Sequence, residues 1–151
     1  HQPRRQRQMC IRDSLYTDPH DAARTVLAEG LIRLGVISQS LDEALDPETG
    51  DLRKWYMHNT SHWIGLDVHD AGVYKPGGTP RVLEPGMCLT IEPGLYFGAW
   101  RPDVDCPERY ANIGIRIEDD VLITTDGPVV LTADCPKSID DIENIVGQDL
   151  A

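Results

Sequence analysis

Apolar residues in the first third of the chain recur with a helical period. One stripe of a helix requires apolar positions every three or four residues, and this spacing is met by Ala23, Leu27, Leu31 and Leu34. We expect this helix to begin near Asp18, with Pro19 in its first turn, and to end at Gly35.

Two shorter helices are indicated by their capping residues. Ser40 and Glu43 have the spacing of a capping box, and Pro47 closes the element that they begin. Ser138 has the same relation to an acidic residue three positions later, and Gly147 can end the helix that follows.

From about residue 66 the helical period gives way to short runs of β-branched residues broken by Gly and Pro. Strands are predicted within residues 88–97, 112–124 and 128–132, with turns between them. Helices at both ends and strands between them predict an α+β fold, with a mostly antiparallel sheet and flanking helices.

Side chains alternate between the two faces of these strands. One face of residues 112–118 should be apolar and face the core: Ile113, Ile115 and Ile117. The other face of that strand carries Arg116 and Glu118. In residues 88–93, Leu89 and Ile91 point one way, whereas Thr90 and Glu92 point the other.

Composition narrows the function classes. The 151 residues carry a net charge of -11, which argues against a nucleic-acid binder, since phosphate contacts need clustered Lys and Arg. No apolar run approaches the roughly 18 residues of a membrane helix. The four cysteines form no CxxC pair, so neither a zinc knuckle nor a disulfide framework is indicated, and we expect a reducing cytoplasm.

The beginning of the chain differs from the rest. Residues 1–14 hold four arginines and almost no apolar pattern, so we interpret them as a disordered or non-native tail. We expect residues 15–151 to form one domain.

Three histidines lie within twelve positions: His58, His62 and His69. The spacing of the first two resembles a zinc-protease helix. That interpretation fails because the glutamate between them is absent and Gly65 opposes a long helix. His20 stands apart from this group and is expected to be exposed.

Glu92 and Glu118 lie in strand-like segments, where glutamate is disfavoured. Two carboxylates and an imidazole such as that of His62 suit a hard or borderline divalent cation. From the residues alone, a metal site is as well supported as the alternative that these carboxylates lie on ordinary solvent-facing sides of strands. Four further carboxylates are expected to be solvated loop or strand-end charges: Asp67, Asp70, Asp119 and Asp120.

Three motifs carry a resemblance to a known family. HNTSHWIGLDVHDAGVY, LEPGMCLTIEPGLY and IGIRIEDDVLIT occur in this order. Together they resemble the C-terminal part of the catalytic domain of pita-bread metallopeptidases, family M24, with Xaa-Pro aminopeptidase (aminopeptidase P) as the nearest branch. The resemblance spans residues 22–145 and implies the C-terminal half of a pita-bread fold.

The resemblance implies roles for particular residues. Three positions match metal ligands of the family: His62, Glu92 and Glu118. Glu92 would also handle protons during turnover. His69 would hydrogen-bond the scissile carbonyl, and His58 would line the proline side of the substrate. Arg116 and Tyr96 match a polar pair that orients groups around the metals.

By the same resemblance the reaction is hydrolysis of the first peptide bond of a substrate with proline at its second position. Two divalent ions, for which the resemblance implies Mn²⁺, would lower the pKa of a shared water and stabilise the oxyanion with His69. Glu92 would pass the proton toward the leaving nitrogen.

One departure from the family pattern is expected to matter. Two further metal ligands of the family are aspartates on an earlier strand, and no aspartate upstream of His58 has that context. We therefore expect an N-terminally truncated fragment that is inactive alone. The resemblance leaves open whether the parent assembles as a homo-oligomer. The alternatives are prolidase, another aminopeptidase of the same fold, or, for this chain itself, a non-catalytic module.

Overall fold

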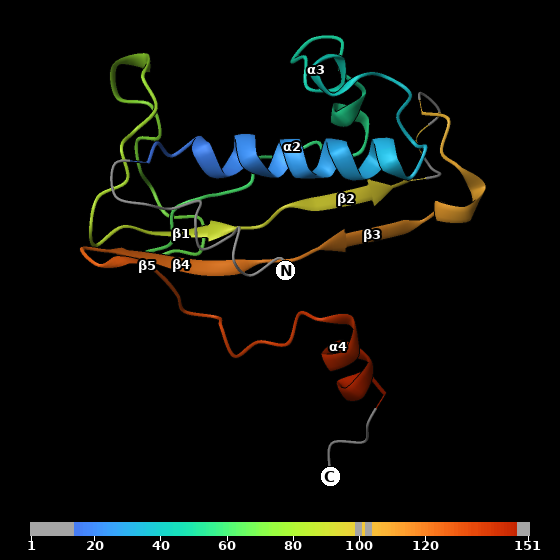
Figure 1. The fold of residues 1–151 in the computed structure, drawn as a ribbon. Helices are drawn as coiled ribbons and strands as arrows, with labels where there is room; N and C mark the ends of the chain where they lie inside the picture. The colour runs from blue at the N-terminus through green and yellow to red at the C-terminus, as the bar shows by residue number, and fades with distance from the viewer. Residues whose placement is uncertain (1–13, 99–100, 102–103, 148–151) are drawn as a thin grey trace.

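The computed structural model describes residues 14–98, 101 and 104–147, and the expected tail up to residue 13 lies outside them. Figure 1 shows its elements. The helices are α2 (Asp18–Arg33), α3 (Leu41–Ala44) and α4 (Ile139–Ile145), with 3-10 turns at Asp51–Lys54, Pro76–Gly78 and Glu108–Tyr110. The strands are β1 (Cys88–Ile91), β2 (Gly94–Phe97), β3 (Ile113–Arg116), β4 (Asp119–Thr124) and β5 (Gly127–Val130).

The helix ends follow the predicted capping chemistry. Helix α2 starts at Asp18 with a proline in its first turn, and Gly35 takes a φ of 70° just beyond its end. At α3, Ser40 and Glu43 form the predicted capping box. The hydroxyl of Ser138 likewise accepts a backbone hydrogen bond at the start of α4. These helices are confirmed.

One member of the predicted apolar stripe on α2 is not buried. Ala23 and Leu31 are buried, but Leu34 is 44% exposed. Leu34 is the C-cap residue of α2, so it lies where the helix has already ended.

Strands β1 to β4 form one long antiparallel ribbon with a break in the middle. In the β1–β4 ladder Ile91 pairs with Asp119, and in the β2–β3 ladder Gly94 pairs with Arg116. Between these two rungs each strand contributes two residues, so both ladders keep the same register. Strand β5 pairs with the outer side of β4, which gives the order β1-β4-β5.

Residues 60–64 lie along the free edge of β1 and extend the sheet. Trp63 forms an antiparallel bridge with Leu89. Backbone hydrogen bonds recur at every second residue: Ile64 N to Cys88 O (3.0 Å), Thr90 N to His62 O (3.0 Å) and Glu92 N to Thr60 O (2.8 Å). Strand β1 is therefore central, and both its apolar face and the face of Thr90 and Glu92 are buried.

Two apolar clusters hold the fold. The first joins α2 and the segment after it to β2, and its buried members are Ala28, Leu31, Ile37, Ala44, Leu52, Trp55, Tyr56 and Phe97. The second packs under β1 and β4, and its buried members are Trp63, Leu83, Leu89, Ile91, Val121 and Ile123. Several candidate site residues are next in sequence to buried members of these clusters: His62 beside Trp63, Glu92 beside Ile91, and Tyr96 beside Phe97.

The predicted core face of residues 112–118 is wrong. Ile113, Ile115 and Ile117 are 43%, 60% and 37% exposed. Figure 1 shows α2 running along the β2 side of the ribbon, and neither apolar cluster includes these isoleucines. Alternation sets which side chains share a face, whereas burial needs an element packed against that face.

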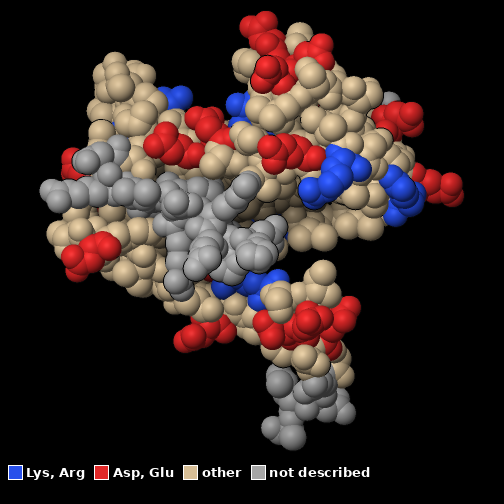
Figure 2. Space-filling model, viewed as in Figure 1, with Lys and Arg blue, Asp and Glu red and all other residues tan. Residues whose placement is uncertain are grey.

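Acidic side chains gather at the first turns of α3 and α4, as Figure 2 shows for the face in view. Carboxylates at a helix N-terminus are stabilised by the helix dipole. None of the helices in the described ranges is both long and apolar enough to cross a lipid bilayer.

Candidate metal centre

The side chains of His62, Glu92 and Glu118 converge at the break in the ribbon. Each offers one ligand atom, and these atoms lie within 4.8 Å of one another. Ile91 and Asp119 form the last rung of the β1–β4 ladder, so the next residues, Glu92 and Glu118, face each other across the break. His62 reaches them from the neighbouring segment 60–64, where its backbone bonds to Thr90.

The tautomer of the neutral His62 ring follows from its partners. Its Nδ1 lies 3.1 Å from the carbonyl oxygen of Trp63, which can only accept, so Nδ1 carries the hydrogen in the neutral ring. The Nε2 lone pair then points at Glu92, whose Oε1 is 3.3 Å away. Two electron-pair donors at this distance suit a cation between them.

Glu92 is held by polar groups although it is only 6% exposed. The Thr90 hydroxyl donates to its Oε1 at 3.0 Å, and Nη1 of Arg116 donates to its Oε2 at 2.8 Å. The same Thr90 hydroxyl accepts from the backbone N–H of His62 at 3.0 Å. The orientation of Glu92 relative to His62 is therefore fixed by one shared threonine.

Arg116, Tyr96 and His58 form a chain of directed hydrogen bonds. Nε of Arg116 donates to the Tyr96 oxygen at 2.7 Å, and the Tyr96 hydroxyl lies 2.9 Å from Nε2 of His58. Nδ1 of His58 donates to the carbonyl of Asn59 at 2.7 Å, which leaves Nε2 as the acceptor. The bond with Tyr96 raises the pKa of Arg116, so its positive charge beside Glu92 persists across the physiological range.

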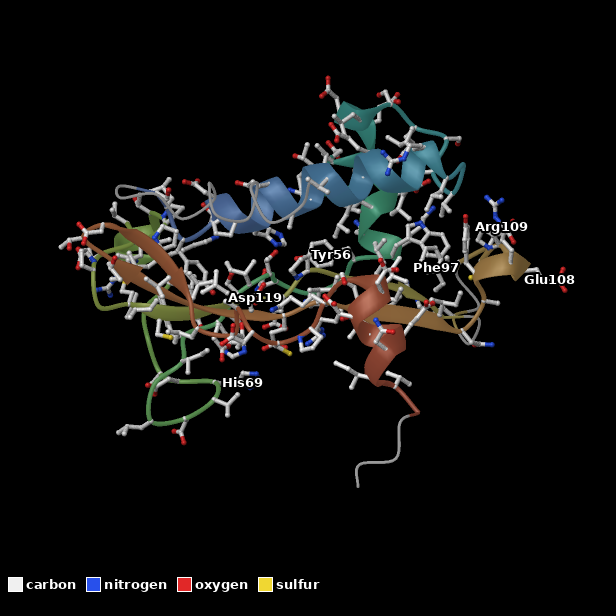
Figure 3. All side chains as sticks on the ribbon, turned by 60° about the horizontal axis from the view of Figure 1, so that its bottom comes forward. Tyr56, His69, Phe97, Glu108, Arg109 and Asp119 are labelled. Atoms are coloured by element: carbon white, nitrogen blue, oxygen red, sulfur yellow. The ribbon has the colours of Figure 1, made fainter. Side chains whose placement is uncertain are left out.

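His69 lies on an exposed loop whose base is pinned to the sheet (Figure 3). Its ring centre is 4.2 Å from that of His62, at a nearly perpendicular angle. The loop leaves little room at its two ends, because a Cβ on Gly65 would meet a carboxylate oxygen of Asp70 at 1.6 Å. His69 thus lies next to the cluster but is not one of its three ligand residues.

The donor set fits a divalent cation. Two carboxylates and one imidazole, with no thiolate, match the preference of Mn²⁺, Zn²⁺ and similar ions. In the described part of the chain the group comprises three residues, and none of the described aspartates belongs to it.

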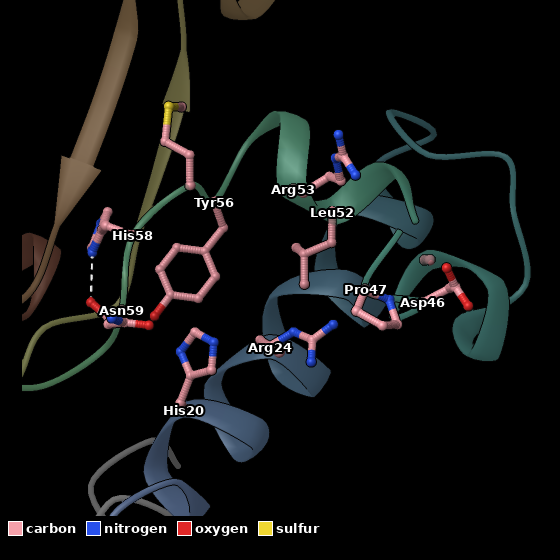
Figure 4. A pocket seen from close by; sticks show the side chains of 11 residues that line it. His20, Arg24, Asp46, Pro47, Leu52, Arg53, Tyr56, His58 and Asn59 are labelled. Carbon is pink, nitrogen blue, oxygen red and sulfur yellow. Dashed lines mark hydrogen bonds between the residues drawn. The ribbon is translucent and has the colours of Figure 1, made fainter. Parts of the chain in front are cut away.

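A pocket of about 400 Å³ is lined in part by His58, which the hydrogen bonds of Tyr96 and Arg116 connect to Glu92 of the cluster. Figure 4 shows His20, Arg24 and Tyr56 on one side of this pocket, with Leu52 and Pro47 farther along it. Its volume is within the range typical of small-ligand sites, about 300–1,000 Å³. The ligand atoms of the cluster lie outside it, so it adds space next to the cluster rather than enclosing it.

The expectation that His20 is exposed is wrong. His20 lies in α2 and is half-buried, with Nδ1 2.9 Å from the hydroxyl of Thr60. The hydroxyl of Tyr56 also bonds to this threonine. These contacts tie α2 to the segment that carries His58 and His62, a role that a lone histidine in a sequence does not signal.

Burial, together with the nearby charge of Arg24, lowers the pKa of His20 below its ordinary value of 6.5. The unfolded chain therefore binds a proton more readily than the folded chain. As a result, the contribution of His20 to the free energy of unfolding is fully present above pH 6.5 and decreases as the pH falls below it. We expect His20→Gln to lose less stability between pH 7 and pH 5 than the unmodified chain, as measured by urea denaturation. Parallel pH curves for the two proteins would contradict this assignment.

A second correction concerns Asp119, which was expected to be a solvated charge. It is 6% exposed and pairs with Lys137 at 2.9 Å. Asp67 is exposed, as expected, and Asp70 accepts hydrogen bonds from the backbone of its own loop. Asp120 is half-buried. Lys137 was not singled out from the sequence at all, because its partner is distant along the chain.

This chain is similar in sequence to known metallopeptidases. The model of metallopeptidase family M24 matches residues 7–125. The Xaa-Pro aminopeptidase of Escherichia coli is 46% identical over 121 residues, covering 80% of this chain and 26% of that protein. Xaa-Pro aminopeptidase 1 of Streptomyces coelicolor is 45% identical over 129 residues, covering 85% and 26%. The chain thus spans about a quarter of the length of these relatives.

Solved structures show the same fold. Aminopeptidase PepP of Pseudomonas aeruginosa superposes with a TM-score of 0.83 at 40% identity, covering 91% of this chain and 30% of that one. Aminopeptidase P of E. coli with the inhibitor Pro-Leu gives a TM-score of 0.76 at 43% identity, with the same coverages. The predicted fold class, α+β with part of a pita-bread fold, is confirmed.

Proposed function

Because the chain belongs to metallopeptidase family M24, we propose that it supplies one part of the catalytic domain of an Xaa-Pro aminopeptidase. The reaction is hydrolysis of the peptide bond before a proline at the second position of a peptide. The relatives named Xaa-Pro aminopeptidase support this substrate class. Within this chain, residues 15–151 would be the domain and residues 1–14 a separate tail.

The observation that carries the proposal is the convergence of His62, Glu92 and Glu118 within 4.8 Å. We propose these three as metal ligands. A divalent cation bound there would act as a Lewis acid that activates water and polarises a peptide carbonyl. We propose two ions, with Mn²⁺ as the native one. Two aspartates outside this chain would complete the ligand set.

The remaining side chains would hold the substrate and move the proton. Glu92 has one oxygen toward His62 and the other toward Arg116, so it can accept a proton at the cluster and deliver it to the leaving nitrogen. His69, on the open side of the cluster, would hydrogen-bond the scissile carbonyl. His58 borders both the cluster and the pocket of about 400 Å³, which suits the proline side of a peptide.

Arg116 has an orienting role in this proposal. It bridges Glu92 and Tyr96, and through Tyr96 it sets the direction of the His58 ring. The guanidinium of Arg116 thereby links Glu92, the proposed proton carrier, to His58 on the substrate side.

We also propose a reducing compartment, the cytoplasm. Three described cysteines, Cys88, Cys106 and Cys135, are free thiols. Assembly as a homo-oligomer belongs to the same proposal for the longer protein.

The test combines metal binding with activity. Mn²⁺ titration of the chain by calorimetry, with His62→Ala as the control, asks whether the cluster binds a cation. Hydrolysis of an Xaa-Pro-Yaa tripeptide, an Xaa-Pro dipeptide and an Xaa-Ala-Yaa tripeptide by the longer protein asks which substrate is cleaved. We expect binding that His62→Ala weakens, and cleavage of the first peptide alone.

Other outcomes would identify the alternatives. Cleavage of the dipeptide alone would favour prolidase, and cleavage of the Xaa-Ala peptide another aminopeptidase of this fold. Mn²⁺ binding unchanged by His62→Ala would overturn the proposed ligand set. Absence of both binding and hydrolysis would favour a non-catalytic module.

A further inference from the structure

Lys137 lies in the segment between β5 and α4, and its ammonium group has an acceptor for each of its three hydrogens. Nζ is 2.9 Å from Oδ1 of Asp119, 2.7 Å from the carbonyl oxygen of Thr132 and 2.9 Å from that of Cys135. An ammonium group has three hydrogens to donate, so each has one acceptor. Lys137 thus folds its own segment into a turn and attaches that turn to one carboxylate of the sheet.

That carboxylate belongs to the residue directly after Glu118. Asp119 is the first residue of β4 and pairs with Ile91, the residue directly before Glu92. Because side chains alternate along a strand, Asp119 points to the opposite face of the sheet from Glu118. Its side chain is only 8% exposed there, and Figure 3 shows Asp119 within the sheet rather than at an outer loop.

Thr132 completes the attachment. Its hydroxyl donates to Oδ1 of Asp119 at 2.7 Å and accepts from the backbone N–H of Asp120 at 3.1 Å. The backbone N–H of Leu131 donates to the carbonyl of Asp120 at 2.8 Å. The start of β4 is therefore held by four contacts. Lys137 and Thr132 bind the carboxylate of Asp119 on the far face, and Thr132 and Leu131 bind the backbone of Asp120 at the β5 edge.

We propose that Lys137 is a positioning residue for the metal centre. By fixing the buried carboxylate of Asp119 it fixes the backbone at the break in the ribbon, and with it the direction of Glu118. The inference rests on the proposed function, since it assumes that Glu118 binds a cation. Glu118 itself is exposed, so the far-face contacts provide the rigidity that its own surroundings lack.

The sign of the effect separates positioning from simple electrostatics. Removing a positive charge near a cation site reduces repulsion, so electrostatics alone predicts tighter cation binding in Lys137→Met. Positioning predicts weaker binding, because the direction of Glu118 is no longer fixed. Loss of a supporting residue around a metal typically weakens affinity about 10–100-fold.

The experiment measures Mn²⁺ affinity by calorimetry for the unmodified chain, Lys137→Met, Lys137→Arg and Lys75→Met. Lys75 is exposed on the loop between His69 and Leu83, so its substitution removes the same charge without touching Asp119. We expect Lys137→Met to bind about tenfold more weakly. Lys137→Arg should recover most of the affinity, and Lys75→Met should bind at least as tightly as the unmodified chain. Equal or tighter binding by Lys137→Met would overturn the inference.

A double-mutant cycle asks whether Lys137 acts through Asp119. We expect Asp119→Asn with Lys137→Met to bind no more weakly than the weaker single variant, whereas fully additive losses would overturn the coupling. In the double variant both side chains are uncharged, so it also tests the inference if Lys137→Met alone does not fold.

Hydrogen exchange of the Asp120 amide provides a readout without metal. We expect at least roughly tenfold faster exchange in Lys137→Met and near-normal exchange in Lys137→Arg. Unchanged exchange in Lys137→Met would overturn the inference even if the unmodified chain bound no Mn²⁺. That absence of binding would by itself count against the proposed function, so the two failures are distinguishable.

Discussion

Glu92→Gln is expected to weaken Mn²⁺ binding by more than about 100-fold, because losing even a supporting residue around a metal costs about 10–100-fold. The substitution keeps the shape of the side chain and removes its charge. Glu92 is the member of the cluster that contacts both His62 and Arg116. An amide in its place leaves Arg116 facing a neutral group and offers the cation a weaker oxygen ligand.

Calorimetry on the two proteins measures this difference directly. Glu84→Gln is a matched control, since Glu84 is exposed in a turn outside the cluster and the same chemical change is made there. We expect the control to bind Mn²⁺ as the unmodified chain does. Comparable affinities for Glu92→Gln and Glu84→Gln would exclude Glu92 from the metal centre.

Leu89→Ala is expected to lower the free energy of unfolding by about 2–5 kcal/mol, the range for truncating a buried leucine. Leu89 has no exposed surface and lies in the second apolar cluster, on the central strand β1. The pairing of Leu89 with Trp63 and Val121 places it between two neighbouring strands. A cavity at this point has little room to close.

Urea denaturation of Leu89→Ala and Leu66→Ala provides the comparison. The side chain of Leu66 is fully exposed, so its truncation is expected to change stability by less than about 0.5 kcal/mol. If both variants lost the same stability, the burial pattern of β1 would be wrong.

The elements whose signals are local could be predicted from the sequence. The capping pair Ser40 and Glu43, and the glycines after α2 and α4, act within a few residues, so a sequence contains all that they need. Burial could not be predicted as well. Ile113 and Ile115 alternate as a core face should, yet what covers a strand is decided by elements far along the chain.

The candidate site divides in the same way. The alternation of Thr90 and Glu92 was visible in the sequence, and the resemblance to the family singled out His62, Glu92 and Glu118, which the structure brings together. The contacts of His20 with Thr60 and of Lys137 with Asp119 connect distant segments. A single histidine or lysine carries no local pattern that indicates such a partner.

The single register of the broken ribbon has a consequence for how the chain folds. Pairing can start at the tip, where Phe97 meets Ile113, and proceed rung by rung through the break to β1 and β4. Each new rung then closes only a small additional loop, so little further chain entropy is lost. This sequential pairing also brings Glu92 and Glu118 together. His62 joins them only when residues 60–64 dock separately against β1. Assembly of the cluster should therefore be limited by the histidine rather than by the two carboxylates.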